Sequence, residues 1–81
     1  MEHPSTEQIK GFILAGLACE HLEVEGDGRH FYAVIVSSSF EWQRTLARQR
    51  AVYAALGERM KEEIHALSMK TYTPSEWQNR Q

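Results

Sequence analysis

Two histidines carry side chains that suit a metal site. His30 stands beside a glycine-rich turn at the start of one apolar run, and His65 stands where another apolar run begins. Neutral imidazole is a common ligand for zinc and iron. Each histidine alone is more often a surface or packing residue, so both interpretations stay open. Because two ligands are too few for a closed four-coordinate site, a metal bound here needs ligands from a partner, and the pair predicts an intermolecular site.

A basic segment offers a second kind of chemistry. Arg44, Arg48 and Arg50 lie within one helix-like run, with Arg59 and Lys61 further on. Clustered arginines suit phosphate contacts, which makes the run a candidate nucleic-acid interface. The formal net charge is −2, however, and a general phosphate binder usually carries a basic excess. We therefore favour a solvated helix face and keep nucleic-acid binding as the alternative.

Residue combinations typical of enzymes are missing from the sequence. No Ser–His–Asp arrangement can be placed, and no glycine-rich loop leads from a strand into a helix. The single cysteine, Cys19, cannot form an internal disulfide, which is typical of a reducing compartment; we interpret it as a small, partly buried hydrophobe. No apolar run approaches the roughly 18 residues of a membrane span, and the first residues lack a secretory signal pattern. We expect a cytoplasmic protein that is not an enzyme and not membrane-bound.

The apolar pattern predicts one small domain that positions these side chains. A chain of 81 residues makes a single domain, in which residues 1–4 are expected to be disordered. A strand–helix–strand connection favours a right-handed crossover, so the third strand should run parallel to the second. This predicts an α+β fold with helices on one face of a three-stranded mixed sheet, in αββααβα order. The expected elements are a helix over 6–17, strands over 22–25 and 31–36, a helix over 45–56 continued by a turn or short helix through 63, a strand over 67–70 and a short helix from 74.

Local signals define the helix ends and faces. Ser5 with Gln8 reads as a capping box, and Thr73-Pro74-Ser75-Glu76 is a complete helix-start signal. Apolar residues at helical spacing are expected to face the core. In the first helix these are Ile9, Phe12, Ile13, Gly16 and Leu17; in the segment from 45 to 64 they are Leu46, Val52, Tyr53, Leu56, Met60 and Ile64.

Five short segments together resemble the BolA family, most closely its short bacterial IbaG-like (YrbA-like) branch. The resemblance runs from about Ile9 to Trp77. It implies the BolA fold, which is similar to the class II KH fold. It also implies a non-enzymatic adaptor or regulator of iron–sulfur and redox homeostasis. The segments are GDGRHF from Gly26, VSSSF ending at Phe40, RQRAVY from Arg48, IHALS from Ile64 and TYTPSEW ending at Trp77.

The same resemblance implies a partner and a shared cofactor. BolA-family proteins pair with monothiol (CGFS-type) glutaredoxins and share a [2Fe–2S] cluster with them, to which the glutaredoxin cysteine and glutathione supply thiolates. The histidine of the IHALS-like motif falls on His65, and the loop between the first two strands offers His30 as the second ligand. Several relatives carry that loop ligand earlier, where this chain has Gly26 and Asp27. No cofactor is expected in the isolated chain, which should be a monomer or weak homodimer.

The family is also linked to transcriptional regulation, which makes DNA a candidate partner for Arg44, Arg48 and Arg50. One position departs from the family pattern. The usual Phe-Glu-Gly is replaced by Phe40-Glu41-Trp42, and a glycine there commonly serves a positive-φ turn. Trp42 thus implies either a different local backbone or an extra exposed aromatic side chain.

Overall fold

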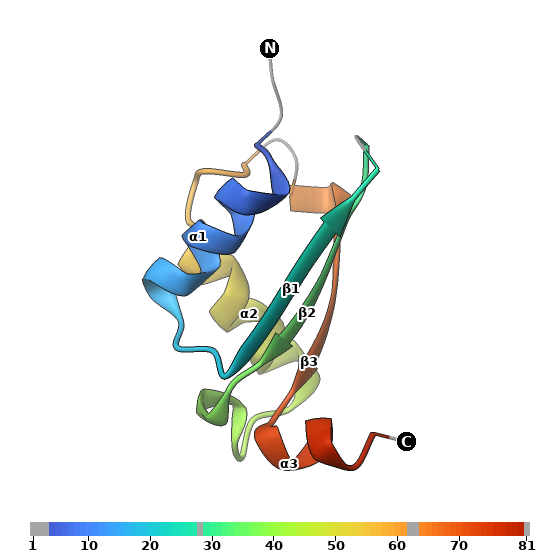
Figure 1. The fold of residues 1–81 in the computed structure, drawn as a ribbon. Coiled ribbons are helices and arrows are strands. Elements are labelled where there is room, and N and C mark those ends of the chain that lie inside the picture. Colours follow the sequence, from blue (N-terminus) through green and yellow to red (C-terminus); the bar gives the residue numbers. More distant parts are fainter. Residues whose placement is uncertain (1–3, 28, 62–63, 81) are drawn as a thin grey trace.

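A three-stranded sheet is the scaffold of the molecule (Figure 1). β1 (His21–Gly26) pairs antiparallel with β2 (Phe31–Val36), and β2 pairs parallel with β3 (Leu67–Tyr72). β2 is therefore the central strand. The computed structural model describes residues 4–27, 29–61 and 64–80.

Helices cover one face of this sheet. α1 (Thr6–Gly16) and α2 (Thr45–Leu56) pack side by side over it, and α2 provides the crossover between the parallel strands (Figure 1). The short α3 (Pro74–Gln78) lies at the end of the sheet where β2 and β3 finish. The predicted α+β class, element order and strand directions are confirmed. In the described part of the chain, η1 (Ser38–Phe40) and η2 (Ile64–Ala66) are 3₁₀ turns.

Some expectations fall on residues outside the described ranges. These are the disorder expected of residues 1–3, the turn position of Gly28 between β1 and β2, and residues 62–63 of the segment after α2. Pro4 immediately precedes the cap of α1. None of the helices in the described ranges is long and apolar enough to cross a membrane.

Both predicted capping boxes are present. At the start of α1, the Ser5 hydroxyl accepts the Gln8 amide hydrogen at 3.1 Å, while the Gln8 side chain accepts the Ser5 amide at 2.8 Å. At α3, Thr73 and Glu76 make the same reciprocal pair, at 3.1 and 2.9 Å. Each box satisfies two amides that the helix itself leaves unpaired. This is why a helix as short as α3 begins where the sequence indicated.

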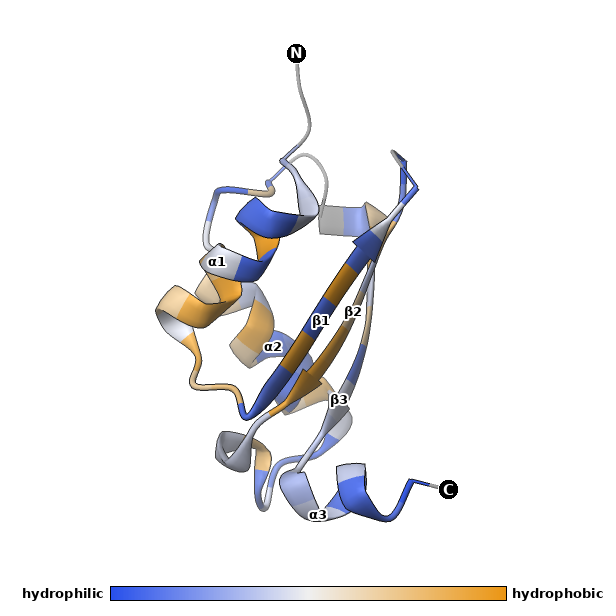
Figure 2. Cartoon of the chain, viewed as in Figure 1, coloured by the Kyte–Doolittle hydropathy of each residue, from blue (hydrophilic) through white to orange (hydrophobic). Residues whose placement is uncertain are grey.

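The core lies between the two long helices and the sheet. The strands present apolar side chains to the helices at every second position, and Figure 2 shows this alternation along β1. Gly16 of α1 approaches Ala55 of α2 so closely that an added Cβ would lie 2.8 Å from the Ala55 Cα. The buried apolar set is Ile9, Ile13, Leu22, Phe31, Ala33, Ile35, Val36, Phe40, Val52, Leu56, Met60 and Leu67.

The predicted apolar stripe of α2 was wrong at two positions. Leu46 and Tyr53 were expected in the core, but their exposed fractions are 59% and 40%. Val52 and Leu56 are fully buried, and at about 100° per residue Leu46 and Tyr53 lie roughly 60–120° around the helix from them. The apolar residues of α2 thus form two stripes, of which only one meets the core.

Candidate functional site

The two candidate histidines lie at the same end of neighbouring strands. The parallel pairing begins with Phe31 opposite Leu67, so His30 and His65 both precede the first pair. His30 ends the β1–β2 turn, and His65 lies in η2. Both side chains are exposed. Because the two strands are parallel, both residues lie at the same end of the sheet, which we call the histidine end.

A carboxylate fixes the backbone at His30. One oxygen of Asp27 accepts the amide hydrogens of His30 and Arg29, at 2.8 and 3.0 Å, and the Asp27 amide donates to the His30 carbonyl at 3.2 Å. These amide hydrogen bonds, that of His30 first, hold the pKa of the Asp27 carboxyl below its ordinary value. Asp27 therefore caps the turn through the backbone of His30, and the imidazole takes no part in these hydrogen bonds.

The histidine end offers an incomplete set of ligands. Across residues 4–27, 29–61 and 64–80, no group of three His, Cys, Asp or Glu side chains is arranged to hold a metal ion. Neither the His30 ring nor the His65 ring makes a hydrogen bond with another described residue, whereas the His21 ring does. Exposed imidazoles without such partners suit a metal centre whose remaining ligands come from another molecule.

Cys19 lies away from the histidine end. It precedes β1, where its thiol donates to the Leu17 carbonyl at 3.4 Å, and it packs against the core as a partly buried side chain. Burial, and secondarily the charge of Glu20, raises the pKa of the thiol. A half-buried thiol with a raised pKa is a poor nucleophile and a poor ligand, which agrees with its interpretation as a small hydrophobe.

Arg48 is engaged inside the fold. Its guanidinium donates to both carboxylate oxygens of Glu76, at 2.7 and 3.1 Å, and to the carbonyls of Gln43 and Thr71, at 2.9 and 3.3 Å. It also lies over the ring of Phe40, with 5.6 Å between Cζ and the ring centroid. Its side chain is only 11% exposed. Arg48 thereby joins α2, β3 and α3, and the structure does not bring it together with Arg44 and Arg50, which are exposed.

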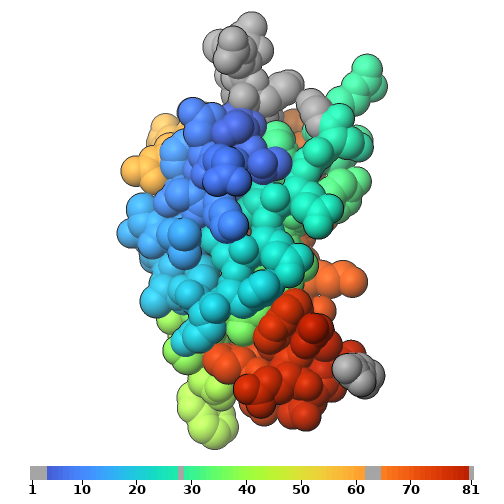
Figure 3. Space-filling model, in the orientation of Figure 1, coloured from blue at the N-terminus to red at the C-terminus, as the bar shows by residue number. Residues whose placement is uncertain are grey.

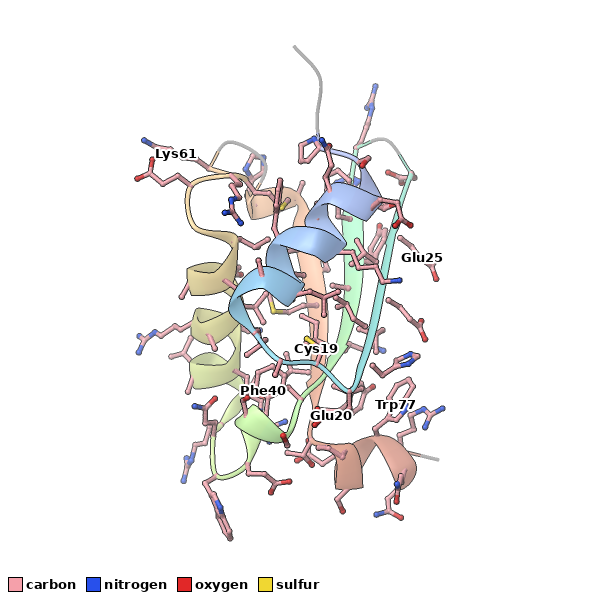
Figure 4. All side chains as sticks on the ribbon, turned by 60° about the vertical axis from the view of Figure 1, so that its left-hand side comes forward. Cys19, Glu20, Glu25, Phe40, Lys61 and Trp77 are labelled. Carbon is pink, nitrogen blue, oxygen red and sulfur yellow. The ribbon has the colours of Figure 1, made fainter. Side chains whose placement is uncertain are left out.

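No pattern in the sequence indicated an aromatic stack at the end of the sheet where β2 and β3 finish. The His21 ring stacks on Trp77, with centroids 4.8 Å apart, and its Nε2 lies 2.6 Å from a Glu23 oxygen. Tyr72 meets Trp77 edge-on at 5.3 Å, and Arg80 covers the indole. Figure 4 shows Trp77 on the side of the sheet opposite Phe40, and Figure 3 shows the α3 segment against the lower end of the molecule. No sequence signal links residues 21 and 77, because tertiary packing alone brings them together.

Trp42 resolves the choice that the sequence left open. Its φ is 67°, the left-handed conformation that glycine adopts without strain. Its side chain is 99% exposed. The backbone expected for a glycine is thus retained, and the indole projects into solvent.

Comparison with known proteins decides the family. A family model described as BolA-like protein matches residues 15–76. The chain belongs to the BolA family. This BolA-family chain is 35% identical to the acid stress protein IbaG of Escherichia coli over 71 residues, which cover 86% of the chain and 84% of that protein. The predicted family and its IbaG-like branch are confirmed.

Two further relatives extend this result. The solved structure of a BolA protein homologue from Coxiella burnetii superposes with a TM-score of 0.82 at 48% identity, covering 94% of this chain and 99% of that one. The DNA-binding transcriptional regulator BolA of Escherichia coli is 41% identical over 56 residues, which cover 69% of the chain and 53% of that protein. The fold is therefore the BolA fold, as expected.

Proposed function

We propose that this BolA-family chain is a non-enzymatic, cytoplasmic adaptor of iron–sulfur and redox homeostasis that works in a complex with a monothiol (CGFS-type) glutaredoxin. The observation that carries the proposal is the histidine end. His30 and His65 are exposed there, just before two neighbouring parallel strands begin, and together they form an incomplete ligand set. A surface of this kind suits a metal centre that two proteins complete together.

In this proposal the shared group is a [2Fe–2S] cluster, which supplies electron-transfer and iron–sulfur chemistry when bound. His65 is the ligand from this chain, and His30 is the second candidate ligand. The glutaredoxin cysteine and glutathione provide the thiolates. Because imidazole binds metal in its neutral form, the complex should weaken in acid.

A nucleic-acid-binding regulator is the rival function. Its support is the name of the Escherichia coli BolA relative and the arginines of α2. Arg48, however, is committed to Glu76 and to two backbone carbonyls, which leaves Arg44 and Arg50 from the candidate set. Binding that rests on so few phosphate contacts is weak. The adaptor is therefore the function that the geometry favours.

The decisive experiment is anaerobic reconstitution of the purified chain with a monothiol glutaredoxin, iron, sulfide and glutathione. Visible absorption and circular dichroism should show a cluster distinct from that of glutaredoxin alone. His65→Ala should abolish or strongly alter this spectrum, and His30→Ala should have an equal or smaller effect. His21→Ala is the matched control, because His21 pairs with Val36 at the other end of the sheet, and it should leave the spectrum unchanged.

Two results would count against this ranking. An unchanged mixed spectrum with His65→Ala would show that His65 is not a ligand. Nanomolar, sequence-selective DNA binding at physiological salt, measured by fluorescence anisotropy, would favour the regulator instead.

A further inference from the structure

Trp42 combines two features that give the fold no benefit. Its φ of 67° is strained for any residue with a Cβ, and its side chain is 99% exposed, so the indole packs against almost nothing. Non-glycine residues in this conformation cluster at ligand clamps and other functional sites. The exposed indole therefore calls for a role outside folding.

Two further large apolar side chains are exposed on α2. Leu46 and Tyr53 are exposed, at 59% and 40%; Leu46 comes four residues after Trp42, and Tyr53 comes seven residues after Leu46. Arg50 lies between them on the same side of the helix, and Arg44 lies at its start; both are exposed. We call this set (Trp42, Arg44, Leu46, Arg50 and Tyr53) the α2 surface. Tryptophan, tyrosine and arginine are the residues most enriched among binding hot spots.

The α2 surface and the histidine end lie at different places on the molecule. β2 leads away from His30 for six residues, about 20 Å at ~3.3 Å per residue, before η1 and Trp42 follow. Figure 1 shows η1 and the start of α2 at the end of the sheet opposite η2. One molecule could therefore hold a partner at each place at once.

We propose that the α2 surface binds a second protein, through an acidic segment that carries apolar side chains. Arg44 and Arg50 form no ion pair with another described residue, so both are available to carboxylates. Trp42, Leu46 and Tyr53 supply the apolar anchors. The whole chain has a net charge of −2, and a basic surface on an acidic protein gives a selective orientation to an acidic partner.

Two other partner classes fit the α2 surface less well. A nucleic-acid strand needs a series of phosphate contacts, but Arg48 is held by Glu76, which leaves only Arg44 and Arg50 on this surface. A lipid surface needs a continuous apolar face with cations at its border, but Arg50 lies between Leu46 and Tyr53. A protein partner can contact alternating charged and apolar groups, because it supplies both carboxylates and apolar side chains.

The test uses a displayed library of random 16-residue peptides as the probe. Peptides that bind the wild-type chain are selected, and those that also bind the Trp42→Gly variant are removed. Selected peptides should be rich in Asp, Glu and apolar residues, and their affinity, measured by fluorescence anisotropy, should fall as salt rises. Trp42→Gly should weaken them by about 30-fold, as for a hot-spot residue, and Arg44→Glu combined with Arg50→Glu should weaken them similarly.

Trp42→Gly also separates binding from folding. Glycine adopts a positive φ without strain, although it gains freedom in the unfolded chain. The Tm of this variant should therefore equal or exceed that of the wild type while peptide binding is lost. His65→Ala should keep full peptide affinity, so failure of this proposal is distinguishable from failure of the glutaredoxin proposal.

Three results would overturn the proposal. The first is a selection that returns no peptide whose binding depends on Trp42. The second is Trp42-dependent binding of a 15-nucleotide oligo-dT strand that outcompetes the selected peptides, which would assign the surface to nucleic acid. The third is Trp42-dependent binding to phosphatidylglycerol vesicles that outcompete the selected peptides, which would assign the α2 surface to lipid.

Discussion

The two ends of the parallel strand pair differ in what their polar side chains contact. Where β2 and β3 finish, Arg48 makes four hydrogen bonds to Gln43, Thr71 and Glu76, and His21 stacks on Trp77. Where the same strands begin, the rings of His30 and His65 are exposed and make no hydrogen bond with another described residue. Groups that satisfy one another stabilise a fold, whereas exposed groups without such partners are available to other molecules. The first end should therefore govern stability and the second should govern binding.

Arg48→Ala should produce the largest loss of stability. It removes hydrogen bonds to two carbonyls from a side chain that is only 11% exposed, and it removes the contact with Phe40. We expect the free energy of unfolding to fall by about 2 kcal/mol, and the Tm by roughly 10 °C for a domain of this size. Thermal and urea unfolding measure both quantities. Arg50→Ala, on the exposed side of the same helix, is the matched control and should change stability by less than about 0.5 kcal/mol.

Trp77→Ala should have the next largest effect. It deletes the stack on His21 and the edge contact with Tyr72, and such aromatic pairs each contribute about 0.5–1.5 kcal/mol beyond the area they bury. We expect a loss of about 1.5 kcal/mol by urea unfolding. Trp42→Ala deletes an indole of the same size that packs against almost nothing, so it should leave stability nearly unchanged. Equal losses from the two substitutions would contradict the difference drawn between these indoles.

Glu76 should make the stability of the fold decrease at acidic pH. The hydrogen bonds from Arg48, and then from the Thr73 amide, lower the pKa of Glu76 from 4.5 to about 2. A carboxyl with a depressed folded-state pKa stabilises the fold above its unfolded pKa, and this contribution is lost as the pH falls toward the folded pKa. Wild-type Tm should therefore fall between about pH 4.5 and pH 2, and Glu76→Gln, already less stable at pH 7, should fall less over that window. Glu25→Gln, an exposed carboxyl on β1, is the control and should follow the wild-type profile.

His65→Ala and His30→Ala should have the smallest effect on stability. Both side chains are exposed, and exposed substitutions usually change the free energy of unfolding by less than about 0.5 kcal/mol. Urea unfolding at pH 7 tests this directly. If either variant unfolds, the histidine end is structural, and the contrast between the two ends of the sheet fails.

Much of the fold was predictable because its signals are local. Ser5 with Gln8, and Thr73 with Glu76, are three residues apart, so a cap can be recognised in a single turn of chain. The apolar run of Phe31–Val36 indicated the central strand, and the length of the connection to β3 indicated a parallel pair. The positions of His30 and His65 at one end of the sheet then followed from the parallel direction of the two strands.

The remaining features were decided by tertiary structure. Which apolar stripe of α2 meets the core depends on how the helix lies on the sheet, so the sequence placed Leu46 and Tyr53 wrongly. The side chain of Arg48 is of a type that binds phosphate, but the fold brings it to Glu76, 28 residues away. Local patterns determine which elements form, because capping and periodicity act within a few residues. Contacts between distant elements determine which side chains remain available, because those contacts exist only once the elements have packed.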